Sequence, residues 1–373
     1  MKATNSILAE YGTTVFEVVS ARARERGALN LGQGFPEGLE PDDVVAAAAD
    51  ALHEGPNQYP PLAGLPELRR AVAAHDRYFH DLDPDPDGEV LITTGASEAL
   101  AAAILALVEP GDEAVVFEPL YDTYIPMLRR AGATPRVVRL APPDWSLDPA
   151  ALDAVVNDRT KLIILNSPHN PTGRVFGRDA LDLVNDRAVR HDAYVLCDEV
   201  YEHLVYGTAA HAPLMTRPGA GDRALRVGSA GKVFSLTGWK VGWLVAESSL
   251  LQRVAKAHQY LTFTVAPNLQ RGVAYGLGRD ADYFNGLTAG LERRRDRLAA
   301  GLEKAGFRVL PCPGTYFLMA DFSPLGFDGD DVAFCRAMVD DAGVAAVPAS
   351  AFYHDDPPTH LIRFCFAKDP SVL

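Results

Sequence analysis

The feature that most constrains this fold is a regular alternation of short apolar runs with longer segments of helical character. The short runs are nearly continuous in apolar residues and cover residues 89–94, 113–118, 161–166, 193–200, 224–229 and 239–246. Strands of this composition are typical of a mostly parallel sheet, because the connecting helices bury both of its faces. The pattern therefore predicts a doubly wound α/β domain over residues 45–280.

The two ends of the chain differ from this central part. Residues 1–44 end in the glycine- and proline-rich segment NLGQGFPEGLEP. Residues 281–373 begin with a long charged segment of helical character and continue with short apolar runs and a helical stretch near 331–342. We expect these two pieces to form a smaller α+β domain, to which the first residues contribute an arm.

Charge and composition exclude several classes of protein. The formal net charge of −14 argues against binding nucleic acid or an anionic membrane through a general positive field. The longest apolar run, Ala99 to Val108, has about half the length that a membrane span needs. The cysteines are far apart and form no CxxC pair, and the first thirty residues hold three glutamates and no long apolar run. We therefore expect a cytoplasmic protein with reduced thiols, no zinc site and no signal peptide.

The segment TTGASEAL (93–100) closes one predicted strand and opens a helix. The first N–H groups of a helix and the helix dipole favour an anion at this position. Gly95 allows an oxyanion to approach the backbone, and Ser97 adds a hydroxyl. Taken alone, the segment is more typical of an ordinary strand-to-helix turn in which Ser97 caps the helix.

Two other polar segments follow predicted strands, where ligands of open α/β sheets bind. In NSPHNPTG (166–173) two prolines stiffen the turn that holds Asn170, whose side chain can donate to a ligand oxygen. In CDEVYEHL (197–204) Asp198 ends an apolar run, where a carboxylate is costly unless it is paired. A cationic nitrogen of a cofactor would be such a partner, and Tyr201 could reach the same place. The alternatives are an Asx turn for Asn170 and a helix cap or a structural ion pair for Asp198.

The stretch SAGKVFSLTGWKVGW (229–243) holds two lysines eight residues apart among glycines and apolar residues. A desolvated lysine beside another cation has a lowered pKa, and its neutral amine is a nucleophile toward carbonyl compounds. We expect this role of Lys232. Lys240 then suits a fixed anion such as a phosphate, with the Ser229 hydroxyl nearby. The alternative is a pair of surface lysines on a turn.

Taken together, these motifs resemble the class I aminotransferases, which are fold-type I enzymes that use pyridoxal 5′-phosphate. The resemblance covers nearly the whole chain and rests on segments in the family's order: NLGQGFP, NQYPP, TTGASEAL, EPLYDTY, NSPHNPTG, DEVYEHL, SAGKVFSLTGWKVGW, GTYFL and IRFCF. Many members have arginine where Lys240 stands, and the lysine form is similar to the kynurenine, glutamine and methionine aminotransferase branch. The resemblance implies a sheet of the seven-stranded type.

The resemblance also implies a role at the cofactor for each candidate residue. Lys232 would form the covalent Schiff-base link and move a proton, and Asp198 would pair with the protonated ring nitrogen. Asn170 and Tyr201 would hydrogen-bond the phenolic oxygen of the ring, and Tyr121 would stack on its face. The phosphate would be held by residues at the helix start and beside it, namely Gly95, Ala96, Ser97, Ser229 and Lys240.

Two residues are implied to bind the α-carboxylate end of an amino acid substrate. Arg363, on the strand of IRFCF, would form a bidentate pair with the carboxylate, with help from the Gly34 backbone. Asn170 would contact the substrate as well as the cofactor.

The resemblance further implies a homodimer with shared active sites. Tyr59, in NQYPP, would reach the cofactor phosphate of the neighbouring subunit. Phe263, like a residue near Val15 or Phe16, would project into the partner's substrate pocket.

The resemblance leaves the substrate open. An apolar pocket fits methionine, aromatic amino acids, kynurenine or glutamine, and no motif supplies a second cation for the side chain of aspartate. The segments TTVFEVVS, NQYPP and RRRDRLAAGL are also similar to an N-succinyl-diaminopimelate aminotransferase. The distal carboxylates of that enzyme's substrate would need a cation, for which Arg271 is the candidate. Elimination from cysteine conjugates (β-lyase activity) would use the same residues. Family chains usually continue past Leu373 with an amphipathic helix, so the presence of such a helix also stays open.

Overall fold

A seven-stranded sheet forms the centre of the protein. The computed structural model describes residue 2 and residues 4–373. The strands lie in the order β2-β8-β7-β6-β5-β3-β4, and neighbours are parallel except that β8 is antiparallel to β2 and β7. Their bounds are β2 Val90–Thr93, β3 Glu113–Glu118, β4 Thr134–Arg139, β5 Thr160–Asn166, β6 Tyr194–Asp198, β7 Ala224–Ser229 and β8 Gly242–Val245. The predicted α/β fold with a mostly parallel sheet is confirmed.

Strand β4 is the one member of this sheet that the sequence analysis missed. It lies at the sheet edge beside β3, and most of its residues are partly or fully exposed. Pro135 lacks a backbone donor, which an edge strand tolerates and a central strand does not. An edge strand of this kind lacks the continuous apolar run that marks the buried strands.

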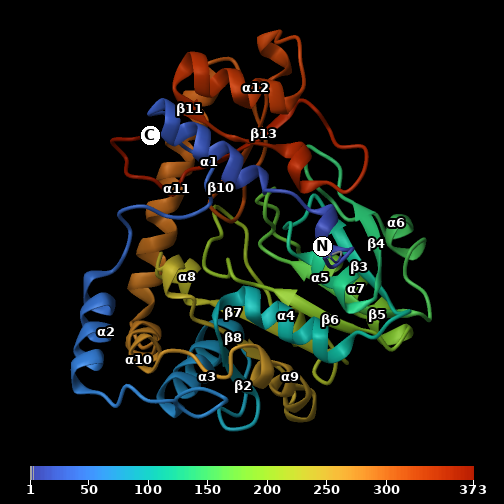
Figure 1. Ribbon diagram of the computed structural model, residues 1–373, viewed down its shortest axis with the longest axis vertical. Coiled ribbons are helices and arrows are strands. Elements are labelled where there is room, and N and C mark those ends of the chain that lie inside the picture. Colours follow the sequence, from blue (N-terminus) through green and yellow to red (C-terminus); the bar gives the residue numbers. More distant parts are fainter. Residues whose placement is uncertain (1, 3) are drawn as a thin grey trace.

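Helices cover both faces of the sheet (Figure 1). Those that follow or flank its strands are α2 Asp42–Glu54, α3 Pro66–His80, α4 Gly95–Leu107, α5 Tyr124–Ala131, α6 Pro149–Asp153, α7 Arg178–Arg190, α8 Ala230–Val233, α9 Ser248–Leu261 and α10 Pro267–Leu277. Short 3₁₀ turns cover Leu8–Glu10, Leu214–Thr216, Thr237–Trp239, Ser323–Leu325 and Ala349–Phe352.

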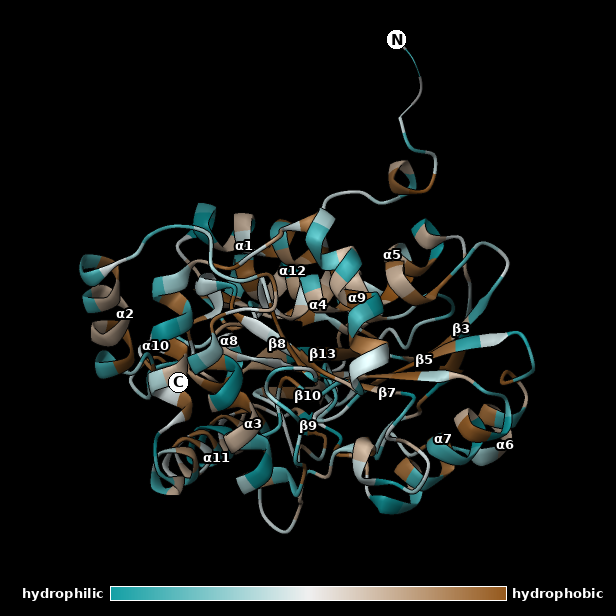
Figure 2. Cartoon of the chain, turned by 90° about the horizontal axis from the view of Figure 1, so that it is seen from below, coloured by the Kyte–Doolittle hydropathy of each residue, from teal (hydrophilic) through white to brown (hydrophobic). Residues whose placement is uncertain are grey.

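Alternating side chains along the strands pack against the two helical layers. In β5, Leu162 and Ile164 belong to the apolar cluster that includes α4 and α5. Ile163 and Leu165 belong to the cluster of α7 on the opposite face. Because successive side chains of a strand point to opposite faces, both sets must be apolar. Figure 2 shows the same result, with brown strands inside and helices that carry teal outer surfaces.

The two ends of the chain meet in a second, smaller layer of structure. A mostly short-stranded antiparallel sheet has the order β12-β13-β10-β9, and β1 pairs in parallel with β11. The bounds are β1 Leu29–Asn30, β9 Arg308–Val309, β10 Phe317–Asp321, β11 Val344–Ala345, β12 Val347–Pro348 and β13 Leu361–Cys365. The helices are α1 Val15–Arg26, α11 Ala281–Lys304 and α12 Asp331–Ala337, with a π-helical turn over Met338–Ala342.

Helix α11 links the two layers, since it runs from the region of α10 up to the region of α1 and β11 (Figure 1). The division into a large domain of residues 45–280 and a small domain of residues 1–44 and 281–373 stays a prediction. Helix α2 begins at Asp42 and packs on α10. Among the described residues, no helix combines the length and the apolar content that crossing a membrane requires.

Candidate active site

A cavity of about 330 Å³ lies at the carboxyl ends of β5, β6 and β7, in front of the first turn of α4. Residues of α1 and β13 border it from the side of the smaller layer. It collects the predicted residues Gly34, Gly95, Ala96, Ser97, Tyr121, Asn170, Asp198, Tyr201, Ser229, Lys232, Lys240 and Arg363. The fold therefore brings together side chains from motifs that are far apart in the sequence.

Lys232 lies on the short helix α8, directly after β7, and its amine points into this cavity. Nζ donates a hydrogen bond of 2.9 Å to the hydroxyl of Tyr316, which in turn donates 2.9 Å to the backbone oxygen of Gly34. Burial lowers the pKa of Lys232 to about 8, although the negative charge of Asp198 opposes this shift. About a tenth of the amine is therefore neutral at pH 7, and this neutral form is nucleophilic.

Asp198 ends β6, and its carboxylate is held from one side only. The hydroxyl of Tyr124 donates a hydrogen bond of 2.5 Å to Oδ2, whereas Oδ1 is buried and has no hydrogen-bond partner. Burial raises the pKa of Asp198, while the bond from Tyr124 and the charge of Lys232 lower it. A buried acceptor without a partner is costly, so Oδ1 suits a ligand that carries an N–H group.

The start of α4, which also lines the cavity, is suited to an anion. Helix α4 begins at Gly95, and the side chain of its N-cap residue Thr94 accepts no hydrogen bond from the helix. Lys240 has φ +54 and lies so close that a Cβ on Gly95 would meet its Cε at 3.4 Å. A Cβ on Gly242 would meet the backbone nitrogen of Ala96 at 2.7 Å, so only glycine allows β8 to approach this helix start. Free N–H groups and an ammonium together favour a phosphate.

Arg363, on β13, is fully buried at the border between the two layers. Nη1 donates 2.9 Å to Oδ1 of Asn170, Nη2 donates 3.0 Å to the oxygen of Gly32, and Nε has no partner. The guanidinium lies 3.9 Å from the ring centre of Phe317, and burial lowers its pKa to about 10. A buried guanidinium with unused N–H groups is a suitable partner for a carboxylate.

A network of amides fixes the loop after β5. Asn166 donates a hydrogen bond of 2.8 Å to the backbone oxygen of Asp198 and accepts one of 2.7 Å from the backbone nitrogen of Asn170.

The ring of Tyr201 lies 5.3 Å from that of Tyr316, and burial raises the pKa of Tyr201. Tyr201 therefore stays a neutral hydrogen-bond donor.

Three residues of the sequence analysis lie outside the lining of this cavity. Tyr59 and Phe263 are 83% and 41% exposed, and their rings contact each other at a centroid distance of 5.6 Å. Arg271 donates to the oxygen of Gly55 at 2.6 Å and to Glu67 at 3.4 Å. Arg271 is thus already engaged by the chain itself.

The expectation that a residue near Val15 or Phe16 projects into the partner's substrate pocket is wrong for Phe16. Phe16 lines the cavity of the chain to which it belongs, rather than projecting away from it toward a partner. The reason is that α1 packs on β11 and β12, which carries its first turn over β13. The ring of Phe16 lies 5.3 Å from the guanidinium of Arg363.

The sequence analysis also missed residues that belong to the site. Tyr124 and Asp122 lie in EPLYDTY beside the predicted Tyr121, and Tyr316 lies in GTYFL. Tyr124 begins α5, so its side chain stands next to the end of β6. The motifs contained these residues, but only the fold shows which hydroxyl meets which partner.

The donor set as a whole fits pyridoxal 5′-phosphate. Lys232 offers an amine for an aldehyde, Oδ1 of Asp198 offers an acceptor for a protonated ring nitrogen, and the start of α4 with Lys240 offers an anion site. Tyr121 also lines the cavity and can cover a flat ring.

Comparisons with known proteins agree with this chemistry. The model of the family "Aminotransferase class I and II" matches residues 26–373. The probable N-succinyldiaminopimelate aminotransferase of Mycobacterium tuberculosis strain H37Rv is 45% identical, over 99% of this chain and 96% of that protein. A solved structure of the Mycobacterium tuberculosis N-succinyldiaminopimelate aminotransferase has a TM-score of 0.96 at 46% identity, covering 99% of this chain and 97% of the other.

Relatives from the predicted branch are similar over nearly the same length. The methionine aminotransferase of Escherichia coli K12 is 39% identical, over 99% of this chain and 95% of that protein. Kynurenine–oxoglutarate transaminase 3 of Rattus norvegicus is 37% identical, over 94% of this chain and 84% of that protein. With its fold, its cavity and these matches, the chain belongs to the class I and II aminotransferases, which depend on pyridoxal 5′-phosphate.

Proposed function

We propose that this aminotransferase takes the amino group from L-amino acids with apolar side chains, or from glutamine, and transfers it to a 2-oxo acid. The observation that carries the proposal is the charge of the cavity lining. Its cations are Lys232, Lys240 and Arg363, and the proposed roles use all three. The remaining lining contains Phe16, Leu100, Tyr121, Val200 and Phe317, which suits methionine, aromatic amino acids and kynurenine.

Asp122 also favours substrates with uncharged side chains, because it disfavours acidic ones. It lines the cavity, and burial raises its pKa while the charge of Arg363 lowers it. A carboxylate in the wall repels a second carboxylate on the substrate. This chain would therefore react slowly with aspartate.

Bound pyridoxal 5′-phosphate supplies a carbonyl for amines and a ring that draws electrons from the substrate Cα. Asp198 would hold a proton on the ring nitrogen through Oδ1, with Tyr124 fixing Oδ2. Arg363 would bind the α-carboxylate and so orient the Cα–H bond toward Lys232. Nζ of Lys232, whose pKa is lowered to about 8, would take up the Cα proton and release it again.

Tyr201 and Asn170 would donate hydrogen bonds to the phenolic oxygen of the cofactor ring. Both side chains line the cavity, and Tyr201 stays neutral because burial raises its pKa. Ser229, at the end of β7, would join Gly95, Ala96, Ser97 and Lys240 at the phosphate.

N-succinyl-diaminopimelate is a second candidate substrate, and the 45% identity to the Mycobacterium tuberculosis relative favours it. Its distal carboxylates need a cation. Arg271 bonds to Gly55 and Glu67 outside the cavity, so it would have to break these contacts to serve. We therefore place this substrate second.

A panel of half-reactions tests the proposal. Single amino acids are added to the holoenzyme, and the loss of the absorbance of the lysine-bound cofactor is followed in a stopped-flow instrument. We expect fast reactions with methionine, aromatic amino acids, kynurenine or glutamine and a slow one with aspartate. Reaction with N-succinyl-diaminopimelate alone would contradict the apolar preference. Pyruvate released from a cysteine conjugate would reveal a β-lyase activity in the same assay.

We also propose a homodimer in the cytoplasm. Tyr59 and Phe263 form an exposed aromatic pair that a second copy would cover, and from there Tyr59 would reach the partner's cofactor phosphate. The four cysteines are free and buried, which suits a reducing compartment.

A further inference from the structure

A second cluster of titratable groups lies behind the active site, and none of its members lines the cavity. His75 and Asp76 come from α3, Glu202 and His203 from the turn after β6, and Arg226 from β7. His80, Glu199 and His211 complete it. These side chains are buried, which is unusual for so many polar groups in one place.

Arg226 explains only part of this cluster. Its guanidinium bonds to Oδ1 of Asp76, to Oε2 of Glu199 and to Oε2 of Glu202. Oδ2 of Asp76 and Oε1 of Glu202 are buried acceptors without a hydrogen-bond partner. Three carboxylates thus face one guanidinium, and His211 pairs with Glu199 at 3.1 Å. Buried carboxylate oxygens without a partner are costly, so these two suit a cation.

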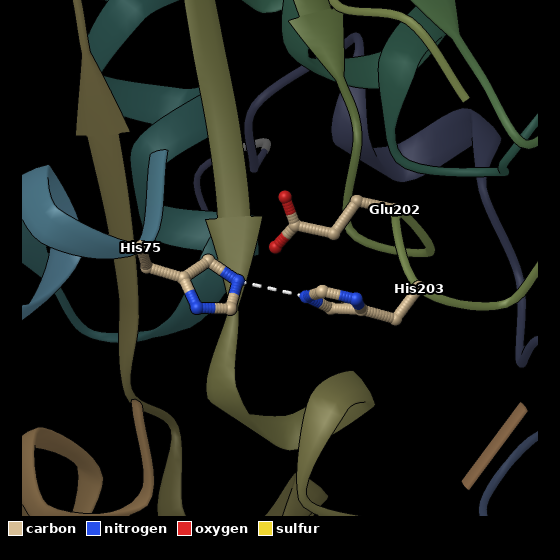
Figure 3. Close-up of side chains that lie close together, drawn as sticks. All are labelled: His75, Glu202 and His203. Carbon is tan, nitrogen blue, oxygen red and sulfur yellow. Dashed lines mark hydrogen bonds between the residues drawn. The ribbon is translucent and has the colours of Figure 1, made fainter. Parts of the chain in front are cut away.

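The ligand atoms of His75, Glu202 and His203 all lie within 4.8 Å of one another. The two ring nitrogens Nε2 face each other at 2.7 Å, and the carboxylate of Glu202 lies over their contact (Figure 3). His80 donates to Oε2 of Glu202 at 2.5 Å, and Arg226 donates to the same oxygen, so the carboxylate is fixed in place. Its other oxygen, Oε1, has no hydrogen-bond partner.

We propose that Nε2 of His75, Nε2 of His203 and the carboxylate of Glu202 bind one divalent transition-metal ion, with zinc as the ion that best suits the set. Two imidazoles and one carboxylate match the ligands that zinc prefers, whereas magnesium and calcium prefer oxygen atoms throughout. Ligand bonds of zinc would separate the two nitrogens to about 3.3 Å, so the rings need to move apart by less than about 1 Å.

The expected role of this ion is structural. Glu202 and His203 lie with Tyr201 in the turn that follows β6, whose last residue is Asp198, and His75 lies on α3. The ion would therefore tie the turn that carries Tyr201 to a helix that covers the sheet. It would not touch the substrate.

The test uses tag-free holoenzyme that is produced in zinc-supplemented medium and purified without chelators. Elemental analysis should give about one zinc ion per chain. Zinc added to chelator-treated protein should raise the unfolding temperature. Anomalous diffraction at the zinc edge should place the ion between His75, Glu202 and His203, and this measurement needs no variant.

Matched variants separate the site from incidental binding. His75→Gln and His203→Gln keep a polar group of similar reach but remove a ligand, and each should weaken zinc binding by more than about 100-fold. His53→Gln, on the exposed surface of α2, should leave zinc binding unchanged. Circular dichroism and cofactor absorbance check that the variants fold. Zinc-free wild type that takes up no zinc on titration, or full zinc content in both ligand variants, would overturn the proposal.

Discussion

The hydroxyl of Tyr124 bonds to Oδ2 of Asp198 at 2.5 Å and leaves the other carboxylate oxygen free inside the cavity. The pair joins the first residue of α5 to the last residue of β6. One oxygen is thus fixed by the protein and the other is reserved for a ligand. This division explains how a carboxylate can be kept ionised at a buried position.

Tyr124→Phe should therefore impair the enzyme without removing any group that touches the substrate. The bond from Tyr124 lowers the pKa of Asp198, so its loss raises that pKa and moves the acid limb of the pH–rate profile to higher pH. A hydrogen bond to a charged group contributes about 1.5–3 kcal/mol, which corresponds to a loss of about 10- to 100-fold in kcat. Tyr121→Phe, which removes a hydroxyl from the neighbouring ring, is the matched control. An unchanged acid limb in the Tyr124 variant would contradict the assignment.

The rate of cofactor binding to the apoenzyme should rise with pH, with its midpoint near pH 8. The amine of Lys232 attacks an aldehyde only when it is neutral, and burial lowers its pKa to about 8 from 10.5. Asp198→Asn removes the charge that raises this pKa, so its midpoint should lie below that of the wild type. Stopped-flow absorbance after mixing with pyridoxal 5′-phosphate gives both profiles. A wild-type midpoint near pH 10 would show that the amine is not desolvated.

Lys232→Ala should keep the fold and lose turnover by at least about 10³-fold, because the variant lacks the amine that would link the cofactor and move the Cα proton. Lys232→Arg preserves the charge but not the nucleophile, and it should be equally inactive. Turnover is measured with the best donor of the half-reaction panel, and circular dichroism reports the fold. Near-normal turnover of either variant would refute the assigned role.

Much of this site follows from the sequence because parallel strands end at a common edge. Asn170, Asp198 and Lys232 each lie at the end of an apolar run or a few residues beyond it, and the fold places all three at one cavity. The apolar runs were informative because both faces of their strands are buried. Strand β4 escaped prediction because its edge position and Pro135 relax that requirement.

The cluster around Arg226 could not be predicted in this way. His75, Glu202 and Arg226 lie on a helix, a turn and a strand far apart in the sequence, and no spacing links them. The sequence analysis excluded a zinc site from its cysteines, which says nothing about histidines that meet only in the folded chain. Likewise, the partner of each hydroxyl, such as Tyr316 for Lys232, depends on packing between the two layers.

Arg363→Lys should raise KM for every amino acid by about 10- to 100-fold, with a smaller change in kcat. Lysine keeps the charge but cannot form two parallel bonds to a carboxylate or stack on the ring of Phe317. Arg271→Lys serves as the control, since its side chain bonds to Gly55 outside the cavity. Steady-state kinetics with methionine and one aromatic donor check both variants. If only the Arg271 variant lost activity, and only toward N-succinyl-diaminopimelate, the result would contradict the role of Arg363 and favour this second candidate substrate.

Tyr260→Asp should dissociate the proposed homodimer and reduce its activity. Tyr260 is 84% exposed on α9, close in sequence to Phe263, which contacts the exposed Tyr59. If a second copy covers these rings, a carboxylate among them loses its water without gaining a partner, which is costly. The isolated subunit would then lack the contribution of Tyr59 to the neighbouring phosphate, so cofactor affinity should fall with the dimer. Tyr78→Asp, at a tyrosine on α3 that is 70% exposed, should leave both unchanged. Light scattering after size exclusion gives the mass of the wild type and of each variant, and activity is measured at several protein concentrations. A monomeric wild type with full activity would refute the shared site.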